Sequence, residues 1–60
     1  MNIRNMDIGG IIAALDFEAL RHESQASVIA EEELRRGHIS LAKRFREAIA
    51  ILRTIDPAAR

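Results

Sequence analysis

Glycine and proline are the residue types that most strongly interrupt helices. In this 60-residue chain they are placed so that two long segments contain neither. Residues 11–36 and residues 38–56 contain neither type, while Gly37 separates the two segments and Pro57 follows the second. Alanine, leucine, glutamate, arginine and isoleucine dominate the composition, and this set is largely helix-favouring. The sequence therefore predicts an all-α fold, an antiparallel helical hairpin.

Gly37 is the predicted turn of this hairpin. Arg35 and Arg36 precede it and place positive charge where the dipole at a helix C-terminus favours it. Glycine just after a helix readily takes the left-handed conformation that ends many helices. His38 is then expected to form part of the turn, either capping the next helix or hydrogen-bonding the last carbonyls of the first. Its alternative role is a surface contact or a pH-sensitive turn.

The predicted helices cover residues 8–15, 17–36 and 39–55 within one small interaction domain, residues 1–60. The first two helices are either separated by a break near residues 15–17, which the sequence favours, or continuous. Asp7 can accept the free N–H groups of the first turn, and Asp16 can do the same after a break. Pro57 stops the last helix because it disfavours helical geometry in the residue before it. Residues 1–6 carry no periodic signal and are expected to fray.

Apolar residues recur every three or four positions in both long segments, which predicts one buried face on each helix. On the last helix the predicted stripe is Leu41, Phe45, Ala48, Leu52 and Ile55, widened by Ala42 and Ile49. The facing residues are Leu15, Ala19, His22, Ala26 and Ile29, with Glu33 continuing the row and Ala30 and Leu34 widening it. The predicted core and interaction residues are Ile12, Leu15, Ile29, Leu34, His38, Leu41, Phe45, Ile49 and Leu52.

A chain of this size has little core of its own. A 60-residue domain buries only about 60% of the surface its unfolded chain exposes, and cysteine, which could supply disulfides, is absent. Several large apolar residues also exceed the inner seam of a hairpin, namely Ile8, Ile11, Ile12, Ile39 and Ile51. We therefore expect a protein partner or a second copy of the chain to complete the fold.

Catalytic and metal-binding patterns find little support in this sequence. Serine and threonine lack a histidine and an acid at useful spacing, and Gly9 and Gly10 lack the rest of a phosphate-binding loop. Glu18 and His22 are four residues apart, but no further ligand cluster accompanies them, so a structural role for His22 is favoured over metal binding. We expect no catalytic residue, no metal and no cofactor, and hence a chain that is not an enzyme by itself.

Charge and hydropathy argue against nucleic acid and membrane partners. Nine basic residues balance nine acidic ones, so the chain has no general attraction for phosphate backbones or anionic lipid. Residues 39–45 have some likeness to a DNA-recognition helix, but the helical pattern continues to Ile55 where a turn should follow. The apolar run at residues 8–15 is far shorter than the about 20 residues that span a bilayer. It also lacks the flanks of a signal peptide, so a soluble protein of the cytoplasm is expected.

The middle of the chain fits the pattern A-x-x-[IV]-A-x-x-E-x-x-x-G-H-x-x-L-A-x-x-[LF]. Its matching residues are Ala26, Ile29, Ala30, Glu33, Gly37, His38, Leu41, Ala42 and Phe45. Residues 22–50 thus resemble the small helical region at the N-terminus of many bacterial AAA-type ATPases, ahead of their nucleotide-binding domain. Residues 1–20 depart from that pattern, and no Walker A or Walker B segment occurs in these 60 residues.

The resemblance implies an accessory domain that recruits a partner or substrate to a ring-forming ATPase. The alternative is a stand-alone small regulatory protein that dimerises into a four-helix bundle. An open reading frame that continues past Arg60 into a Walker A segment would distinguish the first from the second.

Overall fold

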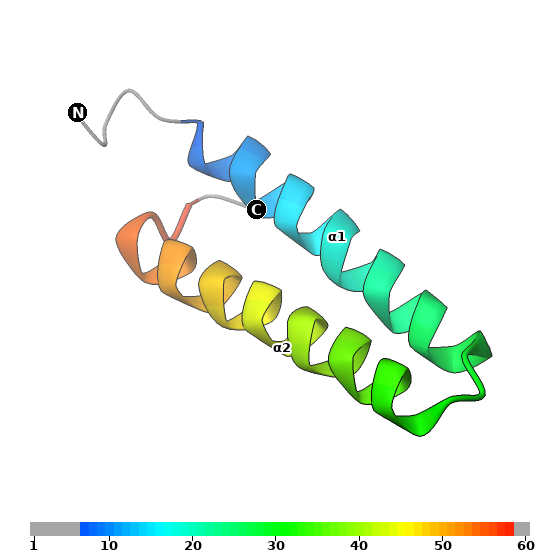
Figure 1. Ribbon diagram of the computed structural model, residues 1–60. Helices are drawn as coiled ribbons and strands as arrows, with labels where there is room; N and C mark the ends of the chain where they lie inside the picture. Colours follow the sequence, from blue (N-terminus) through cyan, green and yellow to red (C-terminus); the bar gives the residue numbers. More distant parts are fainter. Residues whose placement is uncertain (1–6, 59–60) are drawn as a thin grey trace.

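The chain folds into two antiparallel helices joined by a short loop, as the computed structural model of residues 7–58 shows (Figure 1). Helix α1 covers Ile8–Val28 and helix α2 covers Glu32–Ile55. A connection of only three residues holds consecutive helices side by side and reverses their direction. The predicted all-α helical hairpin is confirmed. The expected fraying of residues 1–6 lies outside the described residues.

The position of the turn was predicted wrongly. The chain reverses at residues 29–31, and both Gly37 and His38 lie inside α2. None of the described glycines has a positive φ, so the left-handed turn expected at Gly37 is not formed. Helix α2 accordingly begins at Glu32, seven residues before the predicted start at residue 39, and α1 ends at Val28 instead of residue 36.

Acidic residues explain where α2 begins. Glu32 and Glu33 occupy its first turn, where the positive end of the helix dipole favours carboxylates. Arg36, predicted to lie at a helix end, lies in the second turn of α2 and pairs with Glu32 at 2.7 Å. Ile29 adopts an extended conformation at φ −85° and ψ 122°, and its N–H still donates to the carbonyl of Gln25. The turn therefore forms without glycine.

Helix α1 is a single element, so the break favoured near residues 15–17 is wrong and the continuous alternative is right. Asp16 caps nothing and instead contacts α2. The predicted cap at Asp7 is confirmed, because its carboxylate accepts from the N–H of Gly10 at 2.9 Å. A Cβ at Gly10 would collide with that carboxylate, so glycine fits this first turn. The predicted end of the last helix at Ile55 before Pro57 is also confirmed.

The two helices meet along a seam with spacings of three and four residues, as in antiparallel coiled coils. Its members are half-buried or buried: Ile8, Ile12, Leu15, Ala19, His22 and Ala26 on α1, and His38, Ala42, Phe45, Ile49 and Leu52 on α2. Ile8, Ile12 and Ile49 form the buried cluster, with Leu15 and Leu52 packed against it. Three of the six buried residues in the described chain are alanines, so the core is thin.

The predicted buried face of α2 is rotated relative to the observed one. Ala42 and Ile49, predicted at the margin of the stripe, are its buried centre, at 2% and 4% exposure. Leu41 and Ile55, predicted within the stripe itself, are 44% and 47% exposed. Helix α2 carries two adjoining apolar stripes, and α1 covers only one of them.

Candidate interaction surfaces

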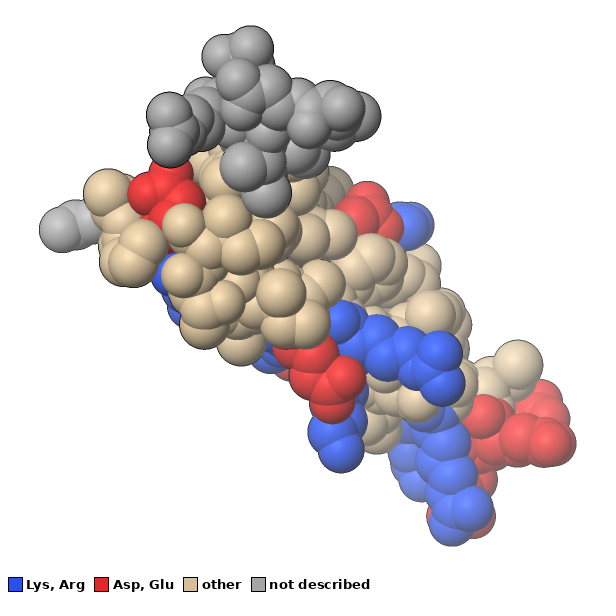
Figure 2. All heavy atoms as spheres, turned by 90° about the vertical axis from the view of Figure 1, so that its left-hand side faces the viewer, with Lys and Arg blue, Asp and Glu red and all other residues tan. Residues whose placement is uncertain are grey.

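Among residues 7–58, the end of the hairpin that carries the two termini has few charged side chains. Residues 8–15 contain no ionisable side chain, and the neighbouring residues 48–55 contain only Arg53. Among the described residues, Figure 2 shows mainly uncharged atoms at this end, whereas lysine, arginine, aspartate and glutamate gather toward the loop. Helices that are apolar on all sides are normally covered by other protein. This distribution makes the terminal half of the hairpin a candidate contact surface.

Helix α1 turns a second apolar face away from α2. This outer face of α1 comprises residues at spacings of three and four on the side opposite the seam: Ala13, Phe17, Leu20, Ser24 and Val28. Phe17, Leu20 and Val28 are 66%, 53% and 81% exposed. Three large exposed apolar side chains on one face of one helix form a patch of the kind that marks protein contacts.

Helix α2 carries the second exposed surface. The outer stripe of α2 consists of Leu34, Leu41, Ala48 and Ile55, each seven residues after the last, and Ile51 stands beside it. Leu34 is 56% and Ile51 62% exposed. An open recess of about 420 Å³ lies over Gly37, between Leu34 and Leu41. A Cβ at Gly37 would meet no atom within 4 Å, so nothing in the hairpin itself requires glycine there.

His22 and His38 face each other across the seam. Their Nδ1 atoms are 2.8 Å apart, with the ring centroids 5.0 Å apart, and the Phe45 ring stacks on His22 at 5.8 Å. One imidazole donates and the other accepts, so at least one of the two rings is neutral. Both histidines are half-buried. His38 is therefore a seam residue, and the predicted turn chemistry does not apply to it. Gly37 and His38, which carry part of the resemblance described above, lie in the interior of α2.

Arg46 ties the two helices together on one side of the seam. It donates to both carboxylate oxygens of Glu23, at 3.0 and 2.6 Å, and to Asp16 at 3.1 Å. The hydrogen bond from Arg46 lowers the pKa of Glu23 below its usual value, and the two carboxylates raise the pKa of Arg46. A separate ion pair, between Glu32 and Arg36, lies within α2.

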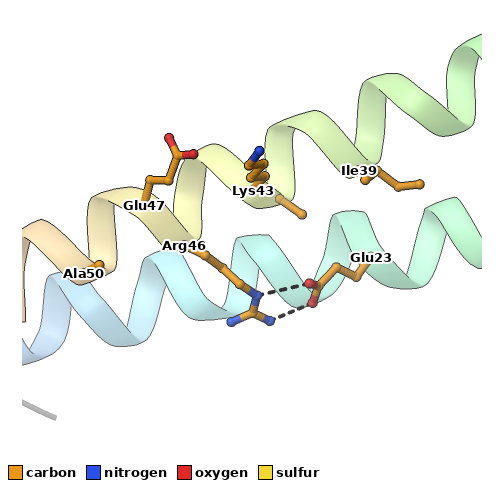
Figure 3. Close-up of a pocket in the computed structure, with 7 residues that line it drawn as sticks. Glu23, Ile39, Lys43, Arg46, Glu47 and Ala50 are labelled. Carbon is orange, nitrogen blue, oxygen red and sulfur yellow. Dashed lines mark hydrogen bonds and ion pairs between the residues drawn. The ribbon is translucent and has the colours of Figure 1, made fainter.

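A shallow groove runs along the same side of the hairpin. Ile39, Ala42 and Ala50 supply its apolar lining. Figure 3 shows Arg46 crossing from α2 to Glu23 at its side, while the Glu47 side chain points away from α1. Since the guanidinium already binds two carboxylates, it is not free to recruit an acidic ligand.

The predicted core and interaction residues lie in three places, which are the seam, the exposed outer stripe of α2 and the loop. Ile12 and Ile49 are buried in the seam, and Leu15, His38, Phe45 and Leu52 are half-buried along it. Leu34 and Leu41 are exposed on the outer stripe of α2, Ile29 lies half-buried in the loop, and Gly37 is exposed within α2. The prediction did not separate Phe17, Leu20 and Val28 as an outward face. Their spacing of three and eight residues could have revealed it.

Within residues 7–58 no group of three or more histidine, cysteine, aspartate or glutamate side chains is arranged to hold a metal ion. Neither described helix combines the length and apolar character needed to cross a bilayer. The chemically distinctive features of this part of the chain are thus its two uncovered apolar surfaces and the histidine pair between them.

Comparison with known protein families, with characterised proteins and with solved structures gives no match to this sequence. The resemblance to the AAA-type region consequently rests on the residues that carry it, which extend from the end of α1 across the loop into α2.

Proposed function

We propose that this chain is a helical protein–protein interaction module, an adaptor that recruits a partner or substrate to an AAA-type ATPase in the cytoplasm. It performs no catalysis itself. The observation that carries the proposal is the outer face of α1, where Phe17, Leu20 and Val28 are more than half exposed. A hairpin with a thin core gains stability when such residues are covered, so binding and folding support each other.

The ATPase part of the proposal comes from the resemblance of residues 22–50. The pattern spans the loop and the first half of α2, and the outer face of α1 lies mostly before it. This division fits an adaptor that shares its helical framework with the AAA-type region but has a contact face of its own. The partner then meets an apolar, aromatic-containing surface, for which an amphipathic helix of the partner is the expected occupant.

Site-specific photo-crosslinking in the native host tests this function. A photoreactive phenylalanine analogue at position 17 is expected to capture a partner, whereas the same analogue at Gln25, an exposed polar position of α1, is not. The purified complex should contain Walker A and Walker B segments, in the captured protein or in the chain that bears residues 1–60. A complex without these segments contradicts the ATPase assignment. Equal capture from both positions contradicts the contact face.

A further inference from the structure

The outer stripe of α2 is complementary to itself when two copies run antiparallel. Leu34, Leu41, Ala48 and Ile55 repeat every seven residues, and the midpoint of the row lies between Arg44 and Phe45. A two-fold axis through that midpoint pairs Leu34 with Ile55 of the second copy and Leu41 with Ala48 of the second copy. At each end of the row, two large side chains meet, Leu34 and Ile55. Nearer the centre, the large Leu41 meets the small Ala48.

Gly37 and Ile51 fit each other in the same arrangement. Gly37 lies three residues after Leu34, and Ile51 lies three residues after Ala48, so both flank the stripe on the same side. The axis places the 62% exposed Ile51 of one copy over the recess above Gly37 of the other. The symmetric contact repeats at the opposite end. Each copy therefore supplies one knob and one hole.

We infer that a second copy of this chain covers the outer stripe of α2, with the two α2 helices antiparallel and Ile51 of each seated on Gly37 of the other. This pairing gives Gly37 a role that the single hairpin does not, since glycine in a helix interior is unfavourable and no neighbouring atom requires it here. The product is a four-helix bundle built from two hairpins through an isologous interface.

The parallel alternative fits less well. With the two-fold axis along the helices, each residue of the stripe meets its own copy, so Gly37 faces Gly37 and Ile51 faces Ile51. Both recesses then stay empty while the isoleucines compete for one space.

Charge and length favour a second copy as the occupant. The chain has zero formal net charge at neutral pH, so two copies do not repel each other as a whole. At 1.5 Å per residue, the stripe from Leu34 to Ile55 is about 32 Å long, which is enough for a continuous contact along the two helices. The pairing uses α2 and leaves the outer face of α1 open, so it adds to the proposed function and is independent of it.

Sedimentation equilibrium over a concentration series, with circular dichroism on the same samples, tests the pairing. The 60-residue chain should be dimeric at micromolar concentration. Gly37→Leu fills the recess and is expected to raise the dimer Kd at least tenfold while helicity is kept or increased. Ala50→Leu adds the same side chain on the groove side of α2 and should leave the Kd unchanged. The double variant Gly37→Leu with Ile51→Ala moves the knob to the opposite chain and should recover most of the lost affinity.

Disulfide trapping determines the direction of the helices, because the chain has no cysteine of its own. A mixture of the Leu34→Cys and Ile55→Cys chains should form mixed disulfides, while each chain alone should not. Disulfides within either pure sample would overturn the antiparallel arrangement. A wild-type chain that is folded and monomeric at millimolar concentration, or equal weakening by Gly37→Leu and Ala50→Leu, would overturn the interface. None of these results would affect the photo-crosslinking of a partner at Phe17.

Discussion

His22 and His38, sixteen residues apart in the chain, share a hydrogen bond of 2.8 Å between their Nδ1 atoms across the seam. The bond closes a polar layer in an otherwise apolar interface, with Phe45 stacked on one of the rings. An apolar seam can slide by one heptad at modest cost, whereas a polar pair favours the one register in which both partners meet. This layer therefore helps to fix the alignment of α1 on α2.

The histidine pair predicts non-additive mutations. His38→Leu leaves His22 half-buried without its partner and is expected to lower the free energy of unfolding by about 1–3 kcal/mol. Replacing both histidines with leucine removes the stranded polar group, so the double variant should be more stable than either single variant. Urea unfolding followed by circular dichroism measures all three. Additive losses in the double variant would show that the two rings do not interact.

Gly37→Ala distinguishes a helical glycine from a turn glycine. In a helix interior, alanine is favoured over glycine by about 0.8–1.0 kcal/mol, and the added Cβ here meets nothing within 4 Å. The melting temperature should therefore rise. The melting temperature should be measured at submicromolar concentration, where self-association contributes least to stability. A fall in melting temperature would indicate that Gly37 needs a left-handed conformation that alanine disfavours, as a turn at Gly37 would require.

Alanine substitutions of Ile49 and Leu41 together test which face of α2 is packed against α1. Ile49→Ala removes a side chain that is 4% exposed and should lower the free energy of unfolding by about 2–5 kcal/mol, enough to unfold much of a small domain. Leu41→Ala truncates a side chain that is 44% exposed and should cost the hairpin less than about 1 kcal/mol. Thermal melts at low concentration provide the comparison. The reverse order of losses would mean that the outer stripe, and not the seam, faces α1.

Acid should weaken the link made by Arg46. The pKa of Glu23 is lowered in the fold by its hydrogen bond to Arg46, so the folded state holds the charged carboxylate more strongly than the unfolded chain does. This contribution is fully present above the unfolded value near 4.5 and is lost as the pH falls through the lower folded value. Glu23→Gln should therefore reduce the difference in melting temperature between pH 7 and pH 3. Glu47→Gln, at an exposed position of α2 whose side chain points away from α1, serves as the control and should leave that difference unchanged.

Local signals in the sequence were sufficient for the helix ends that depend only on neighbouring residues. Asp7 can cap the first turn whatever the rest of the chain does, and Pro57 disfavours continuation of α2 in any fold. The long segments without glycine or proline also determine the helical content. The loop was missed because the arginines at 35 and 36 were interpreted by their preference for a helix C-terminus. The glutamates just before them, which favour a helix N-terminus, carried the stronger signal.

Only the tertiary structure decided which apolar face of α2 is buried. The two stripes of α2 adjoin, and Phe45 and Leu52 border both, so periodicity alone cannot rank them. The choice follows from where the chain reverses, because the loop at residues 29–31 fixes which α1 side chains reach α2. That register brings His22 to His38 and Arg46 to Glu23, contacts between residues too distant in sequence for local preference to specify. The sequence determined two helices with more apolar surface than one hairpin can cover, and long-range packing determined which part of that surface remains open.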